Sequence, residues 1–546
     1  MIQKIITVVF LVLMCPGFAH AQIDEHAKKQ QLNKNRSEKE VWLQDAGFGM
    51  FIHIGVDCQL GIVISHSLVG ASEAYVNRYY SELPKTFDPK NFAPEEIASL
   101  AKLAGMKYVV FTTKHHSGFC MWDTKTTPLN ITNTPYKKDL LHEYVDAVRK
   151  VGLKVGFYYS PEDFYFLHTH NQTIRRIHPD PLADDVMKDY LQLIKDQCTE
   201  LMTDYGKIDL MFFDGEPMEE AKQICWELQP EILITRGALQ TPEQNIPGVI
   251  SDEAWESCIT MGSQWQYKPT NETYKSGSKL IELLIETRAK GGALLLNIGP
   301  KPDGSIPEAQ ENNLREMAAW YFINHEAIDS VRPWILTNEG NYWLTQKAAT
   351  KIVYAFIVSD STWERGLRKE FFFQSIKATP ETKINVLGQS GEVYEYYPDK
   401  DVKSNFEQTS NGLKVSCVRA QRIYNDHDWP NAVVIKMDHV EPALIPPKIT
   451  TVSLEENDNK LFLTGDLLDL GDVNQLKAGF EYRTYKGYVK QFSNTTWHKV
   501  SDIDITHTGE FQIETSTLPP GEYEFRTYVK HPKITLTGNI LRIKLQ

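Results

Sequence analysis

Short apolar runs alternate with amphipathic stretches between residues 42 and 345. Helices are predicted at 94–105 and 140–152, because apolar residues recur there every three or four positions and a glycine ends each stretch. Buried strands are predicted in the runs FGMFIHIG, KYVVFTTKHH, LKVGFYYS, IDLMFFDG, EILITRG and ALLLNIGP. This alternation predicts an α/β fold with a parallel sheet, most simply a (β/α)8 TIM-like barrel. A doubly wound open sheet is the alternative, although no GxGxxG turn follows the first strand.

The pattern changes after residue 346, where strand-like segments follow one another with few helical periods. A β-sandwich over residues 346–442 is predicted from KIVYAFIV, KINVLG, EVYEYYP and AVVIKM. The segment 442–448 has three prolines in seven residues and is predicted to be a linker. A second β-sandwich, of the fibronectin or immunoglobulin type, is predicted over residues 443–546 from FLTGDLLDLG, AGFEYRTYKG, GEFQIET and GEYEFRTYVK. The barrel is assigned to residues 22–345.

Residues 1–21 have the pattern of a signal peptide. Lys4 precedes the apolar run Ile5–Met14, and the small residues of Ala19-His20-Ala21 stand before the expected cleavage site. We therefore expect an exported protein, periplasmic or secreted. No later apolar stretch reaches the roughly 20 residues that a membrane helix needs, so no membrane span is predicted.

The net charge and the spacing of the cysteines argue against a nucleic-acid-binding surface and against a metal site. The formal net charge is -13 at pH 7, and without a basic stripe this argues against nucleic-acid binding. The cysteines beyond the signal peptide form none of the close pairs that zinc or iron–sulfur sites use. We therefore predict buried thiols, with a disulfide or two as the alternative, and neither a metal nor a cofactor. These cysteines are Cys58, Cys120, Cys198, Cys225, Cys258 and Cys417.

Candidate catalytic residues stand where the predicted strands end, because the active site of a barrel lies at the carboxyl ends of its strands. In IDLMFFDG, period-two alternation places Phe212 and Asp214 on one side, so Asp214 is predicted to project into the barrel mouth with Phe212 beneath it. A helix cap or a surface turn is the alternative for Asp214. His53 ends the first strand and His115-His116 ends the second. These histidines suit hydrogen bonds to sugar hydroxyls, and one packed and one exposed histidine is the alternative for the pair.

Two further candidates follow the fifth run. Arg236 ends it, and Glu243 follows in TPEQ, 29 residues beyond Asp214. Two acids on neighbouring loops are what glycoside hydrolysis requires: one ionised to attack the anomeric carbon, and one protonated to donate to the departing oxygen. Arg236 is expected to steady either carboxylate.

At these residues the chain resembles the α-L-fucosidases of glycoside hydrolase family 29. The resemblance rests on eight motifs in family order across residues 42–345, namely FGMFIHIG, KYVVFTTKHHSGFCMWDTKT, KKDLLHE, VGFYYS, IDLMFFDG, TPEQ, WESC and GGALLLNIGPKPDGSIP. It implies a retaining exo-α-L-fucosidase that acts on fucosylated oligosaccharides without a cofactor.

The resemblance also implies a role for each matching residue. Asp214 in FDG matches the nucleophile, and Glu243 in TPEQ matches the general acid/base, for which Glu256 in WESC is the alternative. The residues that match sugar-binding or pocket-lining positions are His53, Glu73, His115, His116, Tyr158, Phe212, Arg236 and Trp265.

Three positions depart from the family pattern. Phe212 and Ala74 stand where the family usually has tryptophan, and Ser117 stands where it commonly has aspartate. The two smaller side chains predict more room around the sugar. L-galactosylated oligosaccharides are therefore the alternative substrate, because L-galactose has a hydroxyl at C6 where L-fucose has none. A non-catalytic carbohydrate-binding protein is the third hypothesis, but it would lack the catalytic carboxylates and both candidates are present.

Overall fold

The computed structural model describes residues 32–247, 253–347, 350–358, 362–424, 429–485 and 496–545. The predicted signal peptide therefore lies outside the described residues. The chain divides into a larger compact unit, residues 24–446, and a smaller one formed by residues 447–546. In the described part of the chain, no helix has the length and apolarity needed to cross a membrane. All six cysteines beyond the predicted signal peptide are free and buried, as predicted.

The larger unit is built around one sheet of seven parallel strands: β1 (Phe48–Ile52), β2 (Tyr108–Lys114), β3 (Lys154–Tyr159), β4 (Leu210–Phe213), β5 (Leu233–Ile234), β6 (Glu256–Thr260) and β7 (Ala293–Ile298). Their order in the sheet is β5-β4-β3-β2-β1-β7-β6. Every residue of β1, β2 and β7 is buried, as expected for a parallel sheet covered on both faces. Because all seven strands run in parallel, their carboxyl ends meet at one edge of the sheet.

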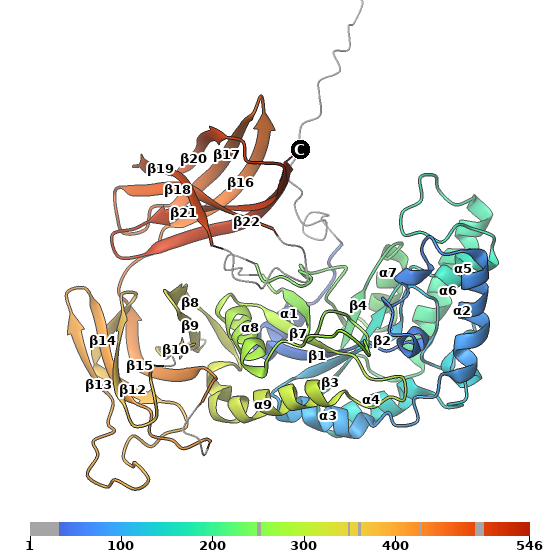
Figure 1. Cartoon of the computed structure of the whole chain (residues 1–546), viewed down its shortest axis with the longest axis horizontal. Helices are drawn as coiled ribbons and strands as arrows, with labels where there is room; N and C mark the ends of the chain where they lie inside the picture. Colours follow the sequence, from blue (N-terminus) through green and yellow to red (C-terminus); the bar gives the residue numbers. More distant parts are fainter. Residues whose placement is uncertain are drawn as a thin grey trace, which may run out of the picture. The chain divides into compact units, whose positions relative to one another are not determined.

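Helices connect these strands (Figure 1): α1 (Ser37–Ala46), α2 (Glu73–Thr86), α3 (Pro94–Leu103), α4 (Leu140–Lys150), α5 (Phe164–Thr169), α6 (Asp184–Thr203), α7 (Glu219–Leu228), α8 (Gly277–Ala289) and α9 (Glu308–Asn324). The helices predicted at 94–105 and 140–152 are α3 and α4. Gly105 and Gly152 follow them with φ angles of 95° and 81°, a conformation that favours glycine.

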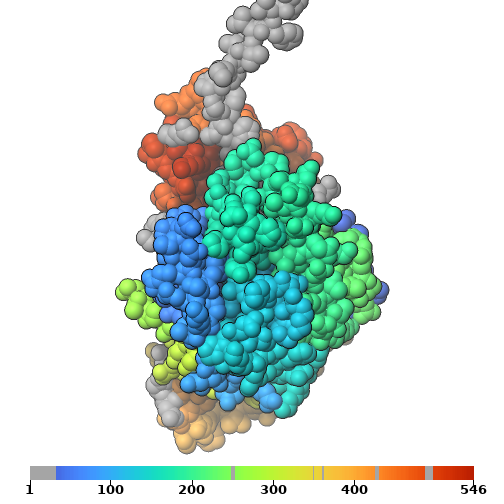
Figure 2. Space-filling model, turned by 90° about the vertical axis from the view of Figure 1, so that its right-hand side faces the viewer, coloured from blue at the N-terminus to red at the C-terminus, as the bar shows by residue number. Residues whose placement is uncertain are grey.

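Two connections that are far apart in the sequence, the one after β1 and the one after β3, lie side by side. The rings of Tyr80 in α2 and Tyr165 in α5 are 4.9 Å apart. Figure 2 shows the blue segment that contains α2 next to the teal and green segment that contains α5 and α6. Helices α2 and α5, from these two connections, therefore pack against each other.

Six of the seven parallel strands coincide with predicted apolar runs. The exception is β6, whose sequence ESCIT mixes polar and apolar residues and gives no continuous run. The sheet differs from the predicted eight-stranded barrel. Within the described residues it has seven strands, and β5 and β6 are its two edge strands. The segment 239–244 runs beside β6 and is joined to it by isolated bridges at Gln240 and Glu243.

Two antiparallel sheets complete the larger unit. Their strands are β8 (Val331–Glu339), β9 (Tyr342–Lys347), β10 (Val353–Ile357), β11 (Arg368–Phe373), β12 (Ile376–Val386), β13 (Asn405–Thr409), β14 (Gly412–Val418) and β15 (Val433–Pro442). One sheet has the order β12-β15-β10-β9-β8 and the other β11-β14-β13. Side chains of the two sheets meet, because the rings of Tyr342 and Phe371 are 5.8 Å apart. The boundary placed at residue 345 falls inside β9.

The segment EVYEYYP, residues 392–398, is a loop and not the predicted strand. Tyr396 and Tyr397 are 71% and 63% exposed, so the alternation of its side chains does not reflect one buried face. Tyr394 packs instead against the cationic groups of Arg365 and Lys400, each 4.7 Å from its ring.

The smaller unit contains only antiparallel strands in its described part: β16 (Lys448–Asn457), β17 (Lys460–Asp469), β18 (Leu476–Thr484), β19 (His498–Ile505), β20 (Gly509–Ser516), β21 (Gly521–Lys530) and β22 (Thr535–Leu545). They form a sheet β16-β17-β20 and a sheet β19-β18-β21-β22. Leu463 from the first sheet and Phe480 and Phe525 from the second belong to one buried apolar cluster. The two sheets of this unit therefore share a core.

Candidate active site

Polar side chains gather where the parallel strands end. His53 follows β1, the pair His115-His116 follows β2, and Asp214 follows β4. Arg236 stands two residues after β5. These strand ends meet at one edge of the sheet. The residues that the sequence predicted at strand ends therefore lie close together there.

Asp214 is surrounded by groups that stabilise its negative charge. The hydroxyl of Tyr158 donates a hydrogen bond to Oδ2 at 2.9 Å. Arg236 Nη1 donates to Oδ1 at 3.4 Å, and Arg176 Nη2 lies 3.8 Å from the same oxygen. Burial opposes ionisation, yet Arg236, with Arg176 and Tyr158, holds the pKa of Asp214 well below its usual range. The carboxylate is therefore charged at neutral pH, as a nucleophile must be.

One nitrogen of Arg236 contacts both candidate acids. Nη1 lies 3.4 Å from Asp214 Oδ1 and 3.1 Å from Glu243 Oε2. The two carboxylate oxygens are therefore no further apart than the sum of these distances. Catalytic carboxyl groups are about 5–5.5 Å apart in retaining glycosidases and about 6.5–9.5 Å apart in inverting ones. The geometry favours the retaining arrangement.

Glu243 owes its place to pairing between the segment 239–244 and β6. Cys258 N–H donates to the carbonyl of Pro242 at 3.1 Å, and Gln244 N–H donates to the carbonyl of Cys258 at 2.9 Å. These bonds hold the backbone of Glu243 directly beside β6. Its side chain remains 30% exposed, which leaves it accessible to a ligand.

His53 and His115 are buried neutral imidazoles. Asn297 Nδ2 donates to the carbonyl of Trp265, so its Oδ1 is the atom that lies 2.6 Å from His53 Nδ1, and Nδ1 carries the hydrogen. Burial lowers the pKa of His53 to about 4. His115 Nδ1 lies 2.8 Å from Ser65 Oγ, and burial lowers the pKa of His115 well below its usual value. Neutral imidazoles with one nitrogen fixed present the other to a hydroxyl group.

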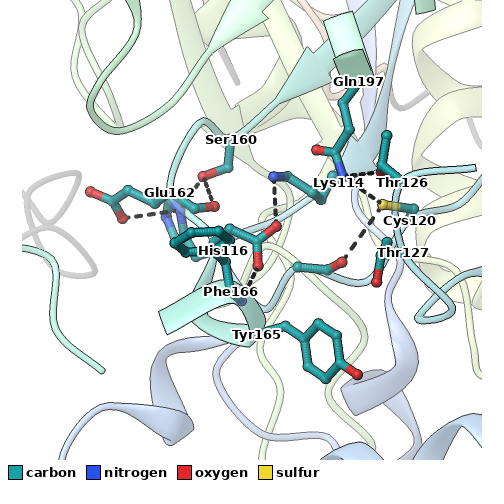
Figure 3. Close-up of polar contacts among 12 residues, drawn as sticks. Lys114, His116, Cys120, Thr126, Thr127, Ser160, Glu162, Tyr165, Phe166 and Gln197 are labelled. Atoms are coloured by element: carbon teal, nitrogen blue, oxygen red, sulfur yellow. Dashed lines mark hydrogen bonds and ion pairs between the residues drawn. The ribbon is translucent and has the colours of Figure 1, made fainter. Parts of the chain in front are cut away.

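His116 has its own set of partners (Figure 3). Its Nδ1 lies 2.6 Å from Ser160 Oγ and 3.2 Å from Glu162 Oε2. The Ser160 hydroxyl donates to the carbonyl of Glu162 at 3.1 Å, so its oxygen accepts the hydrogen of His116 Nδ1. Burial lowers the pKa of His116 to about 3. Its Nε2 therefore has a free lone pair, which lies 3.8 Å from Asp214 Oδ2.

Aromatic rings border the cluster and support it from below. Tyr158 lies parallel to His115, with ring centres 5.5 Å apart, and Trp265 lies 5.0 Å from His53. Phe212 is 1% exposed and packs under the guanidinium of Arg236, 4.6 Å from its ring centre. Phe212 therefore supports Arg236 from below, and its contact with a sugar stays a prediction.

The structure adds residues that sequence reasoning missed. His66 comes from a short 3-10 turn, η3 (His66–Leu68), and its ring lies 5.4 Å from that of His116. Burial lowers the pKa of His66, so this ring, like those of the other histidines of the cluster, is neutral at pH 7. The preceding Ser65 has a φ of 56°, a strained conformation for a serine. No strand end or motif marks these residues in the sequence.

Two residues assigned from the resemblance lie elsewhere. Glu73 begins α2 and is exposed, and within the described residues no hydrogen bond ties it to the cluster, so its contact with a sugar stays a prediction. Glu256 begins β6, about 13 Å from the carboxyl end of that strand. Its Oε1 accepts a hydrogen bond at 2.5 Å from Tyr108, which begins β2. The alternative acid/base therefore lies at the wrong edge of the sheet.

Replacement of Glu256 by Gln is expected to leave turnover nearly unchanged and to stabilise the protein at alkaline pH. Burial raises the pKa of Glu256 to about 7, so the folded state holds this proton more tightly than the unfolded state. The stability of the wild type therefore falls as pH rises toward 7 and stays lower above it. The gain of Glu256→Gln should be small at pH 5 and roughly 1–3 kcal/mol at pH 8. Denaturant unfolding at both values measures it, and a loss of turnover would restore Glu256 as the acid/base.

One group in the described part of the chain has the spacing of a metal site. His115, His116 and Asp214 offer ligand atoms within 4.8 Å of one another. Two guanidinium groups, of Arg236 and Arg176, already face Asp214. Both would repel a cation placed there, whereas neither would repel a neutral sugar. The cluster suits hydroxyl groups better than a metal ion.

Comparison with known proteins places the chain in a family. The family model described as Alpha-L-fucosidase matches residues 17–326, which is more than half of the chain. Plasma alpha-L-fucosidase of Rattus norvegicus is 28% identical over 397 residues, which cover 65% of this chain and 84% of that protein. Tissue alpha-L-fucosidase of Mus musculus is 28% identical over 405 residues, which cover 64% and 84%.

Solved structures show a similar fold. Alpha-L-fucosidase isoenzyme 1 from Paenibacillus thiaminolyticus matches with a TM-score of 0.59 and 27% identity, over 74% of this chain and 99% of that chain. Alpha-L-fucosidase from Vibrio sp. strain EJY3 matches with a TM-score of 0.64 over 94% of this chain and 99% of that chain; at 19% identity this likeness concerns the fold alone. On the extent of the family match, supported by the relatives and the fold, this chain belongs to the α-L-fucosidase family.

Proposed function

We propose that the protein is a retaining exo-α-L-fucosidase that hydrolyses terminal α-L-fucosyl residues of glycans. Membership of the family supports the substrate class. The observation that supports the reaction most directly is the shared contact of Arg236 Nη1 with Asp214 and Glu243. It brings one carboxylate that is charged and one that is partly exposed to the same point, as double displacement requires.

In the proposed reaction, Asp214 attacks the anomeric carbon while Glu243 donates a proton to the departing oxygen. A glycosyl-enzyme forms on Asp214. Glu243 then removes a proton from water, and the water oxygen displaces Asp214 from the anomeric carbon with a second inversion. The neutral imidazoles of His53, His115 and His116 are proposed to bind the sugar hydroxyls, with Tyr158 and Trp265 beside them.

The finer features of the fold are also proposals. The sheet and the segment 239–244 together are proposed to form a TIM-like barrel, supported by the bridges that join this segment to β6. The antiparallel sheets of each unit are proposed to be β-sandwiches, supported in the smaller unit by the core that its two sheets share. We propose export to the periplasm or the medium, on the sequence of residues 1–21 alone.

The α-L-galactoside alternative is not favoured. Phe212 is buried and packs against the guanidinium of Arg236, which gives no sign of a wider site. Ala74 is exposed in the first turn of α2. Among the relatives reported above, each is named as a fucosidase. A purely carbohydrate-binding role is disfavoured by the paired carboxylates.

The protein is expected to hydrolyse nitrophenyl α-L-fucoside much faster than nitrophenyl α-L-galactoside, because the chain belongs to the α-L-fucosidase family. Proton NMR of the first product formed should show α-L-fucose before mutarotation, the sign of retention. A preference for the galactoside would overturn the substrate, and β-L-fucose as the first product would overturn the mechanism.

A further inference from the structure

Glu162 is a third carboxyl group beside the proposed catalytic pair, and the reaction described above gives it no role. It lies just after β3, and its side chain is 9% exposed. Its Oε2 accepts a hydrogen bond from Arg176 Nε at 2.8 Å. The same oxygen lies 3.2 Å from His116 Nδ1 (Figure 3). One carboxylate oxygen thus lies against two side chains and is hydrogen-bonded to Arg176.

Both of these side chains face the nucleophile, and they face different oxygens of it. Arg176 Nη2 lies 3.8 Å from Asp214 Oδ1, and His116 Nε2 lies 3.8 Å from Asp214 Oδ2. The backbone beside Asp214 is close as well, because a Cβ added at Gly215 would lie 2.6 Å from Cδ of Glu162. The carboxyl group of Glu162 therefore lies between the backbone that follows Asp214 and the side chains of Arg176 and His116.

We propose that Glu162 and Arg176 are positioning residues that orient the carboxylate of Asp214, a role that rests on the proposed function. Glu162 fixes the guanidinium of Arg176 toward Oδ1 and packs against the ring of His116, which Ser160 holds through a hydrogen bond. Glu162 acts mainly through Arg176 and not on the substrate. Misplacement of a reacting group by about 1 Å can cost about 10²-fold in rate.

The charge of Glu162 is expected to change near neutral pH. Burial raises the pKa of Glu162 to about 7, although Arg176 opposes the shift. The charged and titratable groups that face it are Arg176, His116 and Asp214. As pH falls below 7, Glu162 takes up a proton and loses its ionic hold on Arg176, so the guanidinium is no longer fixed beside Asp214 Oδ1. Asp214 itself cannot titrate in this range, because its pKa lies well below its usual value.

The test measures kcat/KM for an aryl α-L-fucoside as a function of pH. Glu162→Gln is expected to lose about 10–100-fold at pH 8, and the decline of the wild-type profile below pH 7 should be absent from it. Glu162→Asp keeps a titratable carboxyl group and should keep part of that decline. Arg176→Gln should cause a similar loss, and the double variant should lose little more, because the two residues act as one unit.

Arg175→Gln is the matched control and should behave as the wild type. Within the described residues, Arg175 makes neither a hydrogen bond nor an ion pair with Glu162 or Asp214. Equal thermal midpoints establish that the variants fold. If Glu162→Gln does not fold, Arg176→Gln decides the question, because its side chain is 39% exposed. Wild-type rates and pH profiles in the variants would overturn the positioning role. Retained turnover in Asp214→Asn would instead overturn the proposed function.

Discussion

Replacing Asp214 with Asn is expected to lower kcat for an aryl α-L-fucoside by about 10⁴-fold or more. The amide has nearly the shape of the carboxylate but no negative charge, so it cannot form the bond to the anomeric carbon. Its oxygen can still accept the hydrogen bond that Tyr158 donates at 2.9 Å, so the fold should persist. Steady-state turnover and the thermal midpoint are the measurements.

The same chemical change at Asp204 is the control for Asp214→Asn. Asp204 is exposed at the end of α6, so its variant should keep wild-type turnover. Near-normal rates from a preparation of Asp214→Asn free of contaminating enzyme would remove Asp214 from the nucleophile's role.

The second large effect is expected at Glu243, where Gln should lower kcat/KM on a fucosylated glycan by about 10²–10⁴-fold. The sugar oxygen that departs from a glycan needs a proton, and the amide of Gln cannot supply one. A nitrophenolate departs without a proton, so its fucoside should be affected much less. A series of aryl fucosides with increasingly poor leaving groups measures this difference.

Glu256→Gln serves as the control for Glu243→Gln, because the chemical change is identical and the residue lies at the other edge of the sheet. If Glu243→Gln slows all substrates equally, Glu243 is not the proton donor. His66 then becomes the next group to examine, because its ring lies 5.4 Å from that of His116, which lies beside Asp214.

The parallel strands are the part of the fold that the sequence predicts best. A strand buried on both faces must be apolar throughout, so β2 and β7 appear as continuous runs. Strand β6 is not predicted because it begins with a polar residue, Glu256, which the sequence pattern does not mark as buried. Its burial depends on a hydrogen bond from Tyr108, which is far away in the sequence. The strand predicted at 392–398 is wrong for the opposite reason. Its tyrosines alternate as they would in a strand, but Tyr394 packs on the cationic side chains of Arg365 and Lys400, and the segment is a loop.

The site is predictable only where topology fixes it. Asp214 and His53 follow strands, and parallel strands bring their carboxyl ends together whatever the loops do. The motif WESC leaves Glu256 open as the alternative acid/base because a motif does not show at which end of a strand a residue lies. Glu256 lies at the start of β6, and so at the opposite edge of the sheet from Asp214. Glu162 and Arg176 lie on connections whose path depends on tertiary packing, so spacing along the chain carries no signal for them.

The single guanidinium between the two acids has a consequence for the order of events. In the proposed glycosyl-enzyme, Asp214 is an ester and has lost its charge. Arg236 Nη1 then keeps Glu243 as its ionic partner, 3.1 Å away in the free protein, and stabilises the carboxylate that must draw a proton from water. Before the sugar arrives, the same nitrogen contacts Asp214 as well, at 3.4 Å. One arginine thereby serves first the nucleophile and then the carboxylate opposite it.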